Sequence, residues 1–186
     1  MEIVRSKLEG AFLLKPKVFK DSRGYFIEAF NKEKFQNATG INTEFIQDNE
    51  SGSQKGSLRG LHFQKPPYSQ AKLVRVVVGK VQDVLVDLRS DSPTYGQYQS
   101  YILSDENKHQ LFIPHGFAHA FLTLSDYAIF SYKIDNVYHP ASDSGIIWND
   151  PELNINWELD NDNLILSEKD ASLQSFATYS NKPDFI

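Results

Sequence analysis

The side chains with the clearest potential for chemistry lie in the stretch Ser57–Val74, which reads SLRGLHFQKPPYSQAKLV. His62 lies on an extended run between apolar neighbours, Arg59 precedes it by three residues, and a loop with two prolines leads to Lys72 on the next strand. A histidine can serve as a general base near neutral pH, and a fixed cation can stabilise developing negative charge. The stretch therefore indicates a site where a base and a cation meet over one substrate.

A lone histidine between apolar residues is more often an ordinary core or surface side chain than a catalyst. The company of His62 favours function, because Arg59 and Lys72 are poor core material: burying an ionised side chain without a partner is unfavourable. A ligand that supplies negative charge accounts for both cations. We therefore expect an anionic substrate.

The composition is that of an ordinary globular protein. The chain has 186 residues, of which 40% are apolar and 23% are charged, a balance that argues against disorder. At this length a folded chain buries roughly 70% of its unfolded surface, so residues 1–186 are expected to form one domain. The aromatic content of 13% favours β-structure and a ring-lined pocket.

The net charge of −5 provides no global basic field for nucleic acid or an anionic membrane. The chain contains no cysteine, which excludes disulfides, thiol catalysis and thiolate metal sites. The first ten residues, MEIVRSKLEG, carry charges where a signal peptide needs an apolar core, and no apolar run is long enough to span a membrane. We expect a soluble, cytoplasmic protein that binds neither nucleic acid nor membranes.

Two elements are predicted before the central stretch. Ala11–Phe30 alternates in short extended pieces around the turn residues Asp21–Gly24, which predicts a hairpin. Asn31–Gly40 predicts a short helix that is capped by its first residue and ended by its glycine, with Phe30 packed against Phe35. The helix is expected to lie outside a sheet.

Many short strands at close spacing, with little helix, predict an all-β fold: an antiparallel β-barrel or jelly roll with a few short peripheral helices. No internal repeat or linker divides it. The predicted strands are Glu44–Asn49, Lys72–Val78, Val81–Arg89, Gln99–Ser104, Gln110–Pro114, His119–Leu124 and Tyr127–Lys133.

Two further segments are predicted to be irregular. Ser51–Ser57 (SGSQKGS) has the composition of a Gly/Ser-rich loop, either a mobile flap beside the central stretch or an ordinary solvated loop. The part from Trp148 on reads as loops with one short helix beginning at Ser167. There the pattern SEKD fits a capping box, so the ordinary role of Asp170 is to begin that helix.

Several common catalytic motifs are absent from the chain: GxGxxG after a strand, GxxxxGK[ST], HExxH and GxSxG. Their absence argues against dinucleotide-binding, nucleoside-triphosphatase, zinc-protease and serine-hydrolase functions. The sequence PHGFAH, from Pro114 to His119, forms a P-x-G-x-x-H turn that leads into a strand. It resembles the second motif of the cupin superfamily of small β-barrels, which implies a cupin-type fold.

The resemblance to cupins also bears on metal binding. In metal-binding cupins these motifs supply histidines and a carboxylate, whereas the matching positions here hold His62, Gln64, Lys72 and His119. An amide is a weak ligand for divalent metals, and an ammonium group has no lone pair to donate. We therefore expect no metal, and chemistry carried out by organic groups alone.

Seven pieces of the chain, taken in order, narrow the resemblance: DSRGYFIEAF, QDNESGSQKGSLRGLHFQ, QAKLVRVVVGKVQDVLVDLR, SPTYG, IPHGFAHAF, WNDP and LSEKD. Together they are similar to the dTDP-4-dehydrorhamnose 3,5-epimerase family over most of the chain, from Asp21 to Asp170. Members of that family invert carbons 3 and 5 of a 4-keto-6-deoxy hexose linked to a nucleoside diphosphate, without a cofactor. The expected product here is dTDP-4-dehydro-L-rhamnose, an intermediate of dTDP-L-rhamnose biosynthesis.

The resemblance implies a catalytic role for four residues. Lys72 would stabilise the enolate oxygen at carbon 4, His62 would be the general base, and Asp170 would orient the imidazole and stabilise the imidazolium. Tyr132 would return a proton from the opposite face. Tyr138 would stack on the nucleotide base or assist, and only the family assigns the donor role to Tyr132 rather than Tyr138.

The resemblance also implies substrate contacts, and arginine suits a diphosphate because its planar guanidinium donates in pairs. In the family the N-terminal hairpin crosses to a partner subunit, so we expect a homodimer with exchanged N-terminal strands in which hairpin residues serve the neighbouring site. The chain departs from the family pattern at Ala120, usually glycine, and at Asp143, usually glutamate. The expected contacts are Arg23, Glu28, Gln47, Asn49, Arg59, His119, Tyr138, Asp143 and Lys169.

Two kinds of alternative remain at this stage. One keeps the fold and the substrate class but changes the reaction, to a single-centre epimerase or a 3,4-ketoisomerase. The other is a sugar-nucleotide-binding module without catalysis. Retention of all four reactive groups favours the double epimerase, because a silent module has no need of them together.

Overall fold

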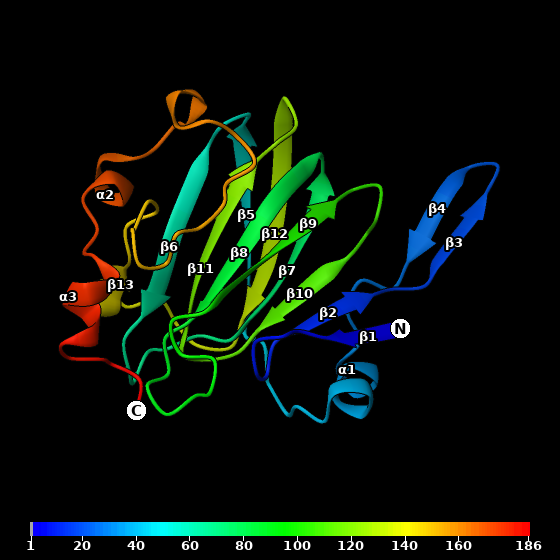
Figure 1. The fold of residues 1–186 in the computed structure, drawn as a ribbon. Coiled ribbons are helices and arrows are strands. Elements are labelled where there is room, and N and C mark those ends of the chain that lie inside the picture. The colour runs from blue at the N-terminus through cyan, green and yellow to red at the C-terminus, as the bar shows by residue number, and fades with distance from the viewer. Residues whose placement is uncertain (1) are drawn as a thin grey trace.

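Two antiparallel β-sheets face each other and form the body of the protein in the computed structural model, which describes residues 2–186 (Figure 1). The six-stranded sheet has the order β1 (Glu2–Arg5), β2 (Phe12–Lys15), β10 (Gln110–Ile113), β7 (Lys72–Val78), β12 (Tyr127–Ile134) and β5 (Gln47–Gln54). The five-stranded sheet has the order β13 (Asp143–Gly145), β6 (Leu58–Gln64), β11 (Phe117–Thr123), β8 (Lys80–Asp87) and β9 (Tyr98–Ser104). The predicted all-β fold is confirmed.

Apolar side chains form three layers around these sheets. One fills the barrel between them, a second lies between the five-stranded sheet and the C-terminal segment, and a third lies between the six-stranded sheet and helix α1 (Lys32–Thr39). The five-stranded sheet is covered on both faces. Its inner strands β8 and β11 are therefore buried along almost their whole length instead of on alternate residues. The layers make the inside of the barrel rigid enough to position a site.

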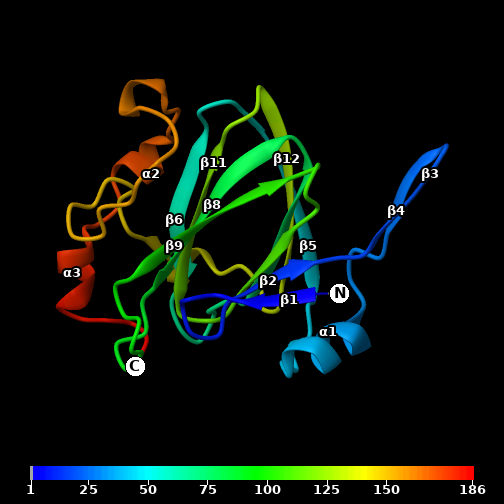
Figure 2. The same ribbon diagram turned by 45° about the vertical axis from the view of Figure 1, so that its right-hand side comes forward.

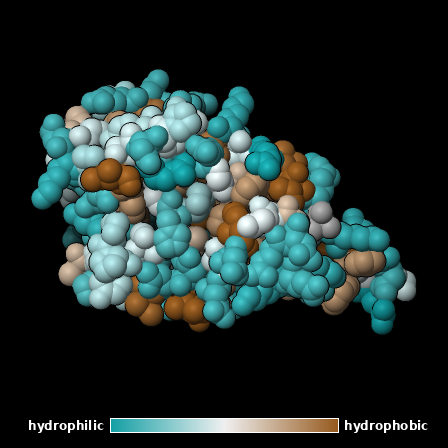
Figure 3. Space-filling view, turned by 90° about the horizontal axis from the view of Figure 1, so that it is seen from below, coloured by the Kyte–Doolittle hydropathy of each residue, from teal (hydrophilic) through white to brown (hydrophobic). Residues whose placement is uncertain are grey.

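The predicted hairpin is confirmed and forms an arm that extends from the body in both ribbon views (Figures 1 and 2). It consists of β3 (Val18–Asp21) and β4 (Gly24–Ile27), and its turn is held by the Arg23 amide, which donates to Asp21 Oδ1 at 2.8 Å. From below, the arm is a narrow projection (Figure 3). Its aromatic side chains are at least half exposed: Phe19, Tyr25 and Phe26.

Helix α1 has the caps that the sequence predicts. The Asn31 side chain accepts a hydrogen bond from the Lys34 amide, and Gly40 ends the helix in the left-handed region at φ 74°. The Phe30 and Phe35 ring centroids are 6.0 Å apart. Phe35 is fully buried, so the helix is held on the outer face of the six-stranded sheet, as expected.

The prediction of a Gly/Ser-rich loop over Ser51–Ser57 is wrong for most of the segment. Strand β5 continues to Gln54 and pairs with β12 through positions such as Ser51↔Phe130. A Cβ built on Gly52 would lie 2.0 Å from the Tyr127 hydroxyl. Glycine is therefore required at position 52 by the close passage of an aromatic side chain across the strand, although the composition of the segment resembles that of a loop.

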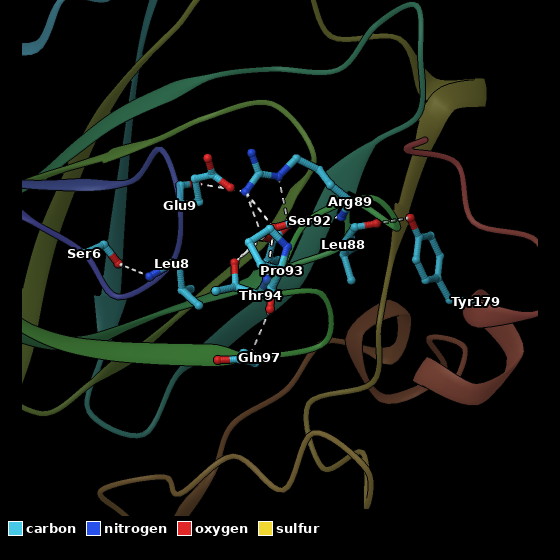
Figure 4. A network of polar contacts seen from close by, with 11 residues as sticks. Ser6, Leu8, Glu9, Leu88, Arg89, Ser92, Pro93, Thr94, Gln97 and Tyr179 are labelled. Carbon is cyan, nitrogen blue, oxygen red and sulfur yellow. Dashed lines mark hydrogen bonds and ion pairs between the residues drawn. The ribbon is translucent and has the colours of Figure 1, made fainter.

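The C-terminal part contains the predicted helix α2 (Glu168–Ala171), which begins after Ser167. It also contains α3 (Phe176–Ser180) and a short 3-10 helix, η2 (Asn161–Asn163), which the sequence did not predict. Helix α3 is fixed by Tyr179, whose hydroxyl donates to the Leu88 carbonyl at 3.0 Å (Figure 4). Packing against the five-stranded sheet thus stabilises a helix too short for propensity to reveal.

A polar network closes the turn between β8 and β9. Arg89 donates to the carbonyl of Glu9 at 2.8 Å (Figure 4). It also donates to the Asp87 carboxylate at 2.7 Å, and Ser92 and Thr94 donate to the same carboxylate. Burial raises the pKa of Asp87, but these hydrogen bonds outweigh burial and hold that pKa below its usual range. The buried charge is therefore satisfied, and the network joins the N-terminal segment to this end of the barrel.

Candidate active site

A cavity of about 430 Å³ opens between the two sheets. It brings together all four residues predicted to be catalytic, which come from β6, β7, β12 and α2. Three of the predicted substrate contacts line it as well: Arg59, His119 and Lys169. Its remaining lining includes an aromatic wall, where the Phe121 and Phe130 rings stack with centroids 4.2 Å apart.

A β-bulge in β6 places Arg59 and His62 on the same side of the strand. Side chains three residues apart on a regular strand point to opposite faces. Here His62 pairs with His119 and Arg59 pairs with Phe121, so three steps on β6 match two steps on β11. The extra residue lies at Gly60, which has φ 121° and whose Cβ would approach the His119 carbonyl oxygen to 2.5 Å. The bulge therefore turns both side chains into the cavity.

His62 and Asp170 form a hydrogen-bonded pair. The His62 Nε2 and Asp170 Oδ1 atoms are 2.5 Å apart, and Asp170 is buried. Burial raises the pKa of Asp170, but the hydrogen bond from His62 and its charge hold that pKa below the usual range. An ionised carboxylate can only accept, so Nε2 carries the hydrogen and Nδ1 keeps its lone pair. Nδ1 is therefore the atom that can take a proton.

Helix α2 fixes the carboxylate of this pair. The Ser167 side chain caps the helix by accepting a hydrogen bond from the Asp170 amide at 3.1 Å. The predicted capping role of Asp170 and its approach to His62 are thus compatible, because its backbone makes one contact and its side chain makes the other. A four-residue helix serves here mainly to aim a carboxylate into the barrel.

Lys72 begins β7 and reaches the cavity beside a carboxylate that the sequence did not indicate. Burial lowers the pKa of the Lys72 ammonium group to about 8, although the charges of Asp83 and Asp143 oppose that shift. Asp83 lies on β8 with no exposed surface. The sequence holds a partial signal, because Asp83 falls on the same alternation as Val81 and Leu85, whose side chains fill the barrel.

His119 is paired with the same carboxylate. Its Nε2 lies 2.9 Å from one Asp83 oxygen and 3.1 Å from the other. Burial lowers the pKa of His119, and this outweighs the opposing effect of Asp83. His119 is thus a neutral imidazole that donates to Asp83, which leaves only its Nδ1 for a ligand.

Tyr132 lines the cavity from β12, in the sheet opposite His62. Burial raises the pKa of its hydroxyl, and the charge of Arg59 offsets this only in part. The phenol therefore keeps its proton at neutral pH and can act as an acid. Since His62 lies in the facing sheet, a base and an acid stand on opposite sides of the cavity.

Three of the predicted substrate contacts form a chain at the edge of the cavity. The exposed Tyr138 hydroxyl donates to Asp143 Oδ2 at 3.1 Å, and the same oxygen pairs with Lys169 Nζ. This hydrogen bond, with the charge of Asp143, raises the pKa of Tyr138. Asp143 thus links an aromatic ring outside the cavity to a cation inside it.

The other four predicted contacts lie outside the cavity of their own chain. Arg23 pairs with Asp21 at 2.6 Å on the arm, and Glu28 pairs with Lys34 at 2.8 Å. On β5, Gln47 donates to Asn49 at 2.8 Å, and Asn49 is the register partner of Tyr132. The structure therefore brings seven of the predicted residues to one cavity and two to its edge, and leaves these four apart.

The four positions that match metal ligands in cupins are occupied differently here. His62 and His119 hold carboxylates through Nε2, and the amide of Gln64 is hydrogen-bonded to backbone groups of two loops. Within residues 2–186, no group of three or more histidine, aspartate or glutamate side chains is arranged to hold a metal ion. The predictions of no metal and no cofactor remain predictions.

The fold and the cavity are those of an acid–base enzyme of the jelly-roll type, in which a histidine held by a carboxylate, an ammonium group and a phenol line one cavity. The profile of the family described as dTDP-4-dehydrorhamnose 3,5-epimerase matches residues 5–178. The chain belongs to this family, and it is an isomerase.

Relatives and solved structures agree with that membership. A dTDP-4-dehydrorhamnose 3,5-epimerase from Methanothermobacter thermautotrophicus is 52% identical over 168 residues, which cover 90% of each chain. A dTDP-6-deoxy-D-glucose-3,5-epimerase from Legionella pneumophila, solved with dTDP-4-keto-L-rhamnose, has a TM-score of 0.90 at 45% identity, covering 94% of this chain and 92% of that one. The cupin-like jelly roll is therefore confirmed.

One solved structure with the same fold has a narrower described activity. A 3'-monoepimerase from Streptomyces bikiniensis in complex with dTDP-quinovose has a TM-score of 0.89 at 34% identity, covering 95% of this chain and 88% of that one. The fold thus occurs with one-centre as well as two-centre epimerases. As for membranes, no helix within residues 2–186 is long and apolar enough to cross one.

Proposed function

We propose that this chain inverts carbons 3 and 5 of dTDP-4-dehydro-6-deoxy-D-glucose and forms dTDP-4-dehydro-L-rhamnose for dTDP-L-rhamnose biosynthesis. One observation carries the proposal: the His62–Asp170 pair, Lys72 and Tyr132 line a single cavity, with base and acid on facing sheets. Inversion next to a ketone requires a base on one face of the sugar, an acid on the other, and a cation at the carbonyl oxygen.

The first half of the reaction is removal of a proton. His62 Nδ1 takes the proton from the carbon beside the ketone. The electron pair of that C–H bond forms a double bond to carbon 4, and the π pair of the carbonyl moves to the carbon-4 oxygen. Asp170 stabilises the imidazolium that results, and the Lys72 ammonium stabilises the enolate oxygen. With a pKa of about 8, Lys72 remains mostly charged at neutral pH and is also acidic enough to share its proton with the enolate.

The second half is delivery of a proton to the opposite face. Tyr132 donates its hydroxyl proton to the enolate carbon while the carbon-4 oxygen regains its double bond, which inverts the centre. His62 then loses its proton to solvent and Tyr132 regains one, so no net proton is consumed. Repeating the sequence at the other carbon gives the double epimerisation. A donor in the sheet opposite the base supports Tyr132 over Tyr138, whose ring is exposed at the edge.

The remaining polar groups suit a dTDP moiety. Arg59 is pre-oriented by donating to Ser53 Oγ at 3.0 Å and to the Gly52 carbonyl at 3.3 Å, which leaves part of its guanidinium for phosphate. His119 and Lys169 line the same cavity. Tyr138 presents an exposed ring on which the nucleotide base stacks, and Asp143 holds that hydroxyl beside Lys169.

The proposal includes a homodimer in the cytoplasm, with residues 1–186 acting as one domain. The arm carries uncovered aromatic rings next to Arg23, and such a surface favours burial against another chain. Crossing to a partner would carry Arg23, Glu28 and neighbouring residues to a second cavity. Gln47 and Asn49 would complete the site from β5, beside Tyr132.

A second candidate is epimerisation at carbon 3 alone, favoured by the structural similarity to a 3'-monoepimerase. Proton NMR of dTDP-4-keto-6-deoxy-D-glucose with the protein in deuterated water distinguishes the two. We expect loss of the signals at carbons 3 and 5. Loss at carbon 3 alone with the ketone still at carbon 4 selects the monoepimerase. Loss at carbon 3 with the ketone moved to carbon 3 overturns both in favour of a ketoisomerase, and loss at neither carbon overturns both in favour of a binding module.

A further inference from the structure

The side chain of Gln64 holds a loop together at the end of β6. It is only 6% exposed. Its Nε2 donates to the carbonyls of Tyr68 at 2.8 Å and Val137 at 3.0 Å, and its Oε1 accepts from the amide of His139 at 2.7 Å. Both donor hydrogens are used, so the carboxamide is committed to the backbone and has no hydrogen left to offer a substrate.

Two of these contacts lie on either side of Tyr138. Gln64 accepts from the amide of His139 and donates to the carbonyl of Val137, so it fixes the backbone on both sides of Tyr138. Tyr138 itself is 57% exposed and contacts Asp143, whose own register partner in the β13–β6 ladder is Gln64. The position of the ring therefore depends on the backbone on which Gln64 acts.

One ring stack and several hydrogen bonds hold this loop. The Tyr68 and His139 rings stack with centroids 4.0 Å apart, while Val137 is about half exposed. Gln70 donates to the Asn136 carbonyl at 2.9 Å, and Asn136 donates to the Pro67 carbonyl at 3.0 Å. A buried donor or acceptor without a partner is unfavourable, so buried hydrogen bonds can fix a loop where there is no hydrophobic core. Of these contacts, those of Gln64 are the most buried.

We propose that Gln64 is a positioning residue for nucleotide recognition: its carboxamide holds the backbone on both sides of Tyr138 so that the ring meets the nucleotide of the substrate. This inference rests on the proposed function, which gives Tyr138 the nucleotide base. It assigns Gln64 no contact with the reacting carbons. Its loss therefore weakens binding of the nucleotide and leaves the proton-transfer groups in place.

The chain offers a matched control in Gln82. This glutamine is 1% exposed, donates to the Asn156 carbonyl at 2.8 Å and accepts from the Glu158 amide at 2.9 Å, so it brackets Trp157 as Gln64 brackets Tyr138. Gln64→Met and Gln82→Met each remove a carboxamide that is hydrogen-bonded to the backbone on both sides of one aromatic residue. Both should lower the melting temperature. We expect only Gln64→Met to weaken dTDP binding, roughly tenfold, with a matching rise in KM and little change in kcat.

A double-mutant cycle with Tyr138→Ala separates positioning from general instability. If Gln64 acts through Tyr138, adding Gln64→Met to Tyr138→Ala changes dTDP affinity by less than about twofold. Unchanged affinity in Gln64→Met, equal losses in both Met variants, or full additivity with Tyr138→Ala would overturn the proposal.

Should Gln64→Met fail to fold, Gln64→Glu replaces it, because it keeps the acceptor for His139 and loses both donors. Calorimetry with dTDP needs no turnover, so a wild-type protein that binds but exchanges no hydrogen contradicts the proposed reaction and still tests this inference.

Discussion

Two buried carboxylates, each bonded to a histidine, have different effects in this cavity. Asp170 is paired with His62, and Asp83 is paired with His119 while also facing Lys72. Under the proposed mechanism the first supports a base that gains charge during the reaction, and the second keeps a neutral imidazole and an ammonium group in place. Asp170, and not Asp83, therefore balances the positive charge that forms on His62 during turnover.

Replacing Asp170 with asparagine should lower kcat by on the order of 10³-fold or more, because an amide neither fixes the His62 tautomer nor stabilises the imidazolium. Binding of dTDP should change little, since the pair faces the sugar. Glu168→Gln on the same helix is the control: it makes the same chemical change at an exposed position and should retain full activity. Solvent hydrogen exchange measures the first effect and calorimetry the second. Full exchange by Asp170→Asn would contradict the mechanism.

The lowered pKa of Lys72 predicts a loss of activity at alkaline pH. The ammonium form stabilises the enolate, and it disappears as the pH rises through about 8. We expect kcat/KM to fall about tenfold per unit above that pH. Lys72→Arg should show a flat profile over the same range in its residual activity, because guanidinium stays charged. If kcat/KM of Lys72→Arg also falls above the same pH, the titration belongs to another group.

The free energy of unfolding should rise with pH over the same alkaline range in which activity falls. The pKa of Lys72 is lower in the folded protein than its ordinary value of 10.5, so the unfolded chain binds more protons between pH 8 and 10.5. Raising the pH across this window therefore stabilises the wild type relative to Lys72→Met. Denaturant unfolding at both ends of the window checks the sign. If the wild type becomes more stable relative to Lys72→Met while its activity falls, unfolding is not the cause of the lost activity.

At the scale of elements, the bulge in β6 carries much of the site. Gly60→Ala combines a strained φ of 121° with a clash 2.5 Å from the His119 carbonyl oxygen. We expect a loss of about 3 kcal/mol in unfolding free energy and a large loss of exchange activity, because Arg59 and His62 no longer share a face. Gly24→Ala, at φ 131° with open space around it, should lose only about 1 kcal/mol. Equal losses in both variants would show that the clash is unimportant.

The sequence predicts elements well where the signal is local. Helix α1 was predictable because its caps and its aromatic contact lie within a few residues of each other. The strand over Ser51 and Gly52 was not, because its composition reflects a Tyr127 ring that arrives from a distant part of the chain. Helix α3 is likewise stabilised by contacts far away in sequence, such as that with Leu88.

The same difference between local signals and contacts from distant segments applies to the site. The family resemblance named the residues that the structure brings into the cavity, among them His62 and Lys72. It did not name Asp83, and the alternation along β8 does not show that this carboxylate lies against His119 and beside Lys72. Nor did the spacing of Arg59 and His62 predict a shared face, since only the bulge provides it.

At the scale of the whole molecule, the arm should make two chains interdependent. Arg23→Ala and His62→Ala homodimers should each be impaired, for different reasons. Unfolding and refolding them together should restore roughly a quarter of wild-type turnover at low substrate concentration, because half of the dimers are then mixed and each has one intact site. Refolding each variant alone is the control. No recovery above the two separate variants would mean that Arg23 serves its own chain.

The hydrogen bonds of Gln64 also bear on how such a protein can evolve. A histidine at this position would restore one of the positions that hold metal in related barrels, but an imidazole cannot donate to two carbonyls and accept from an amide at once. The first mutational step towards a metal site would therefore loosen the loop around Tyr138 before any ion could be held.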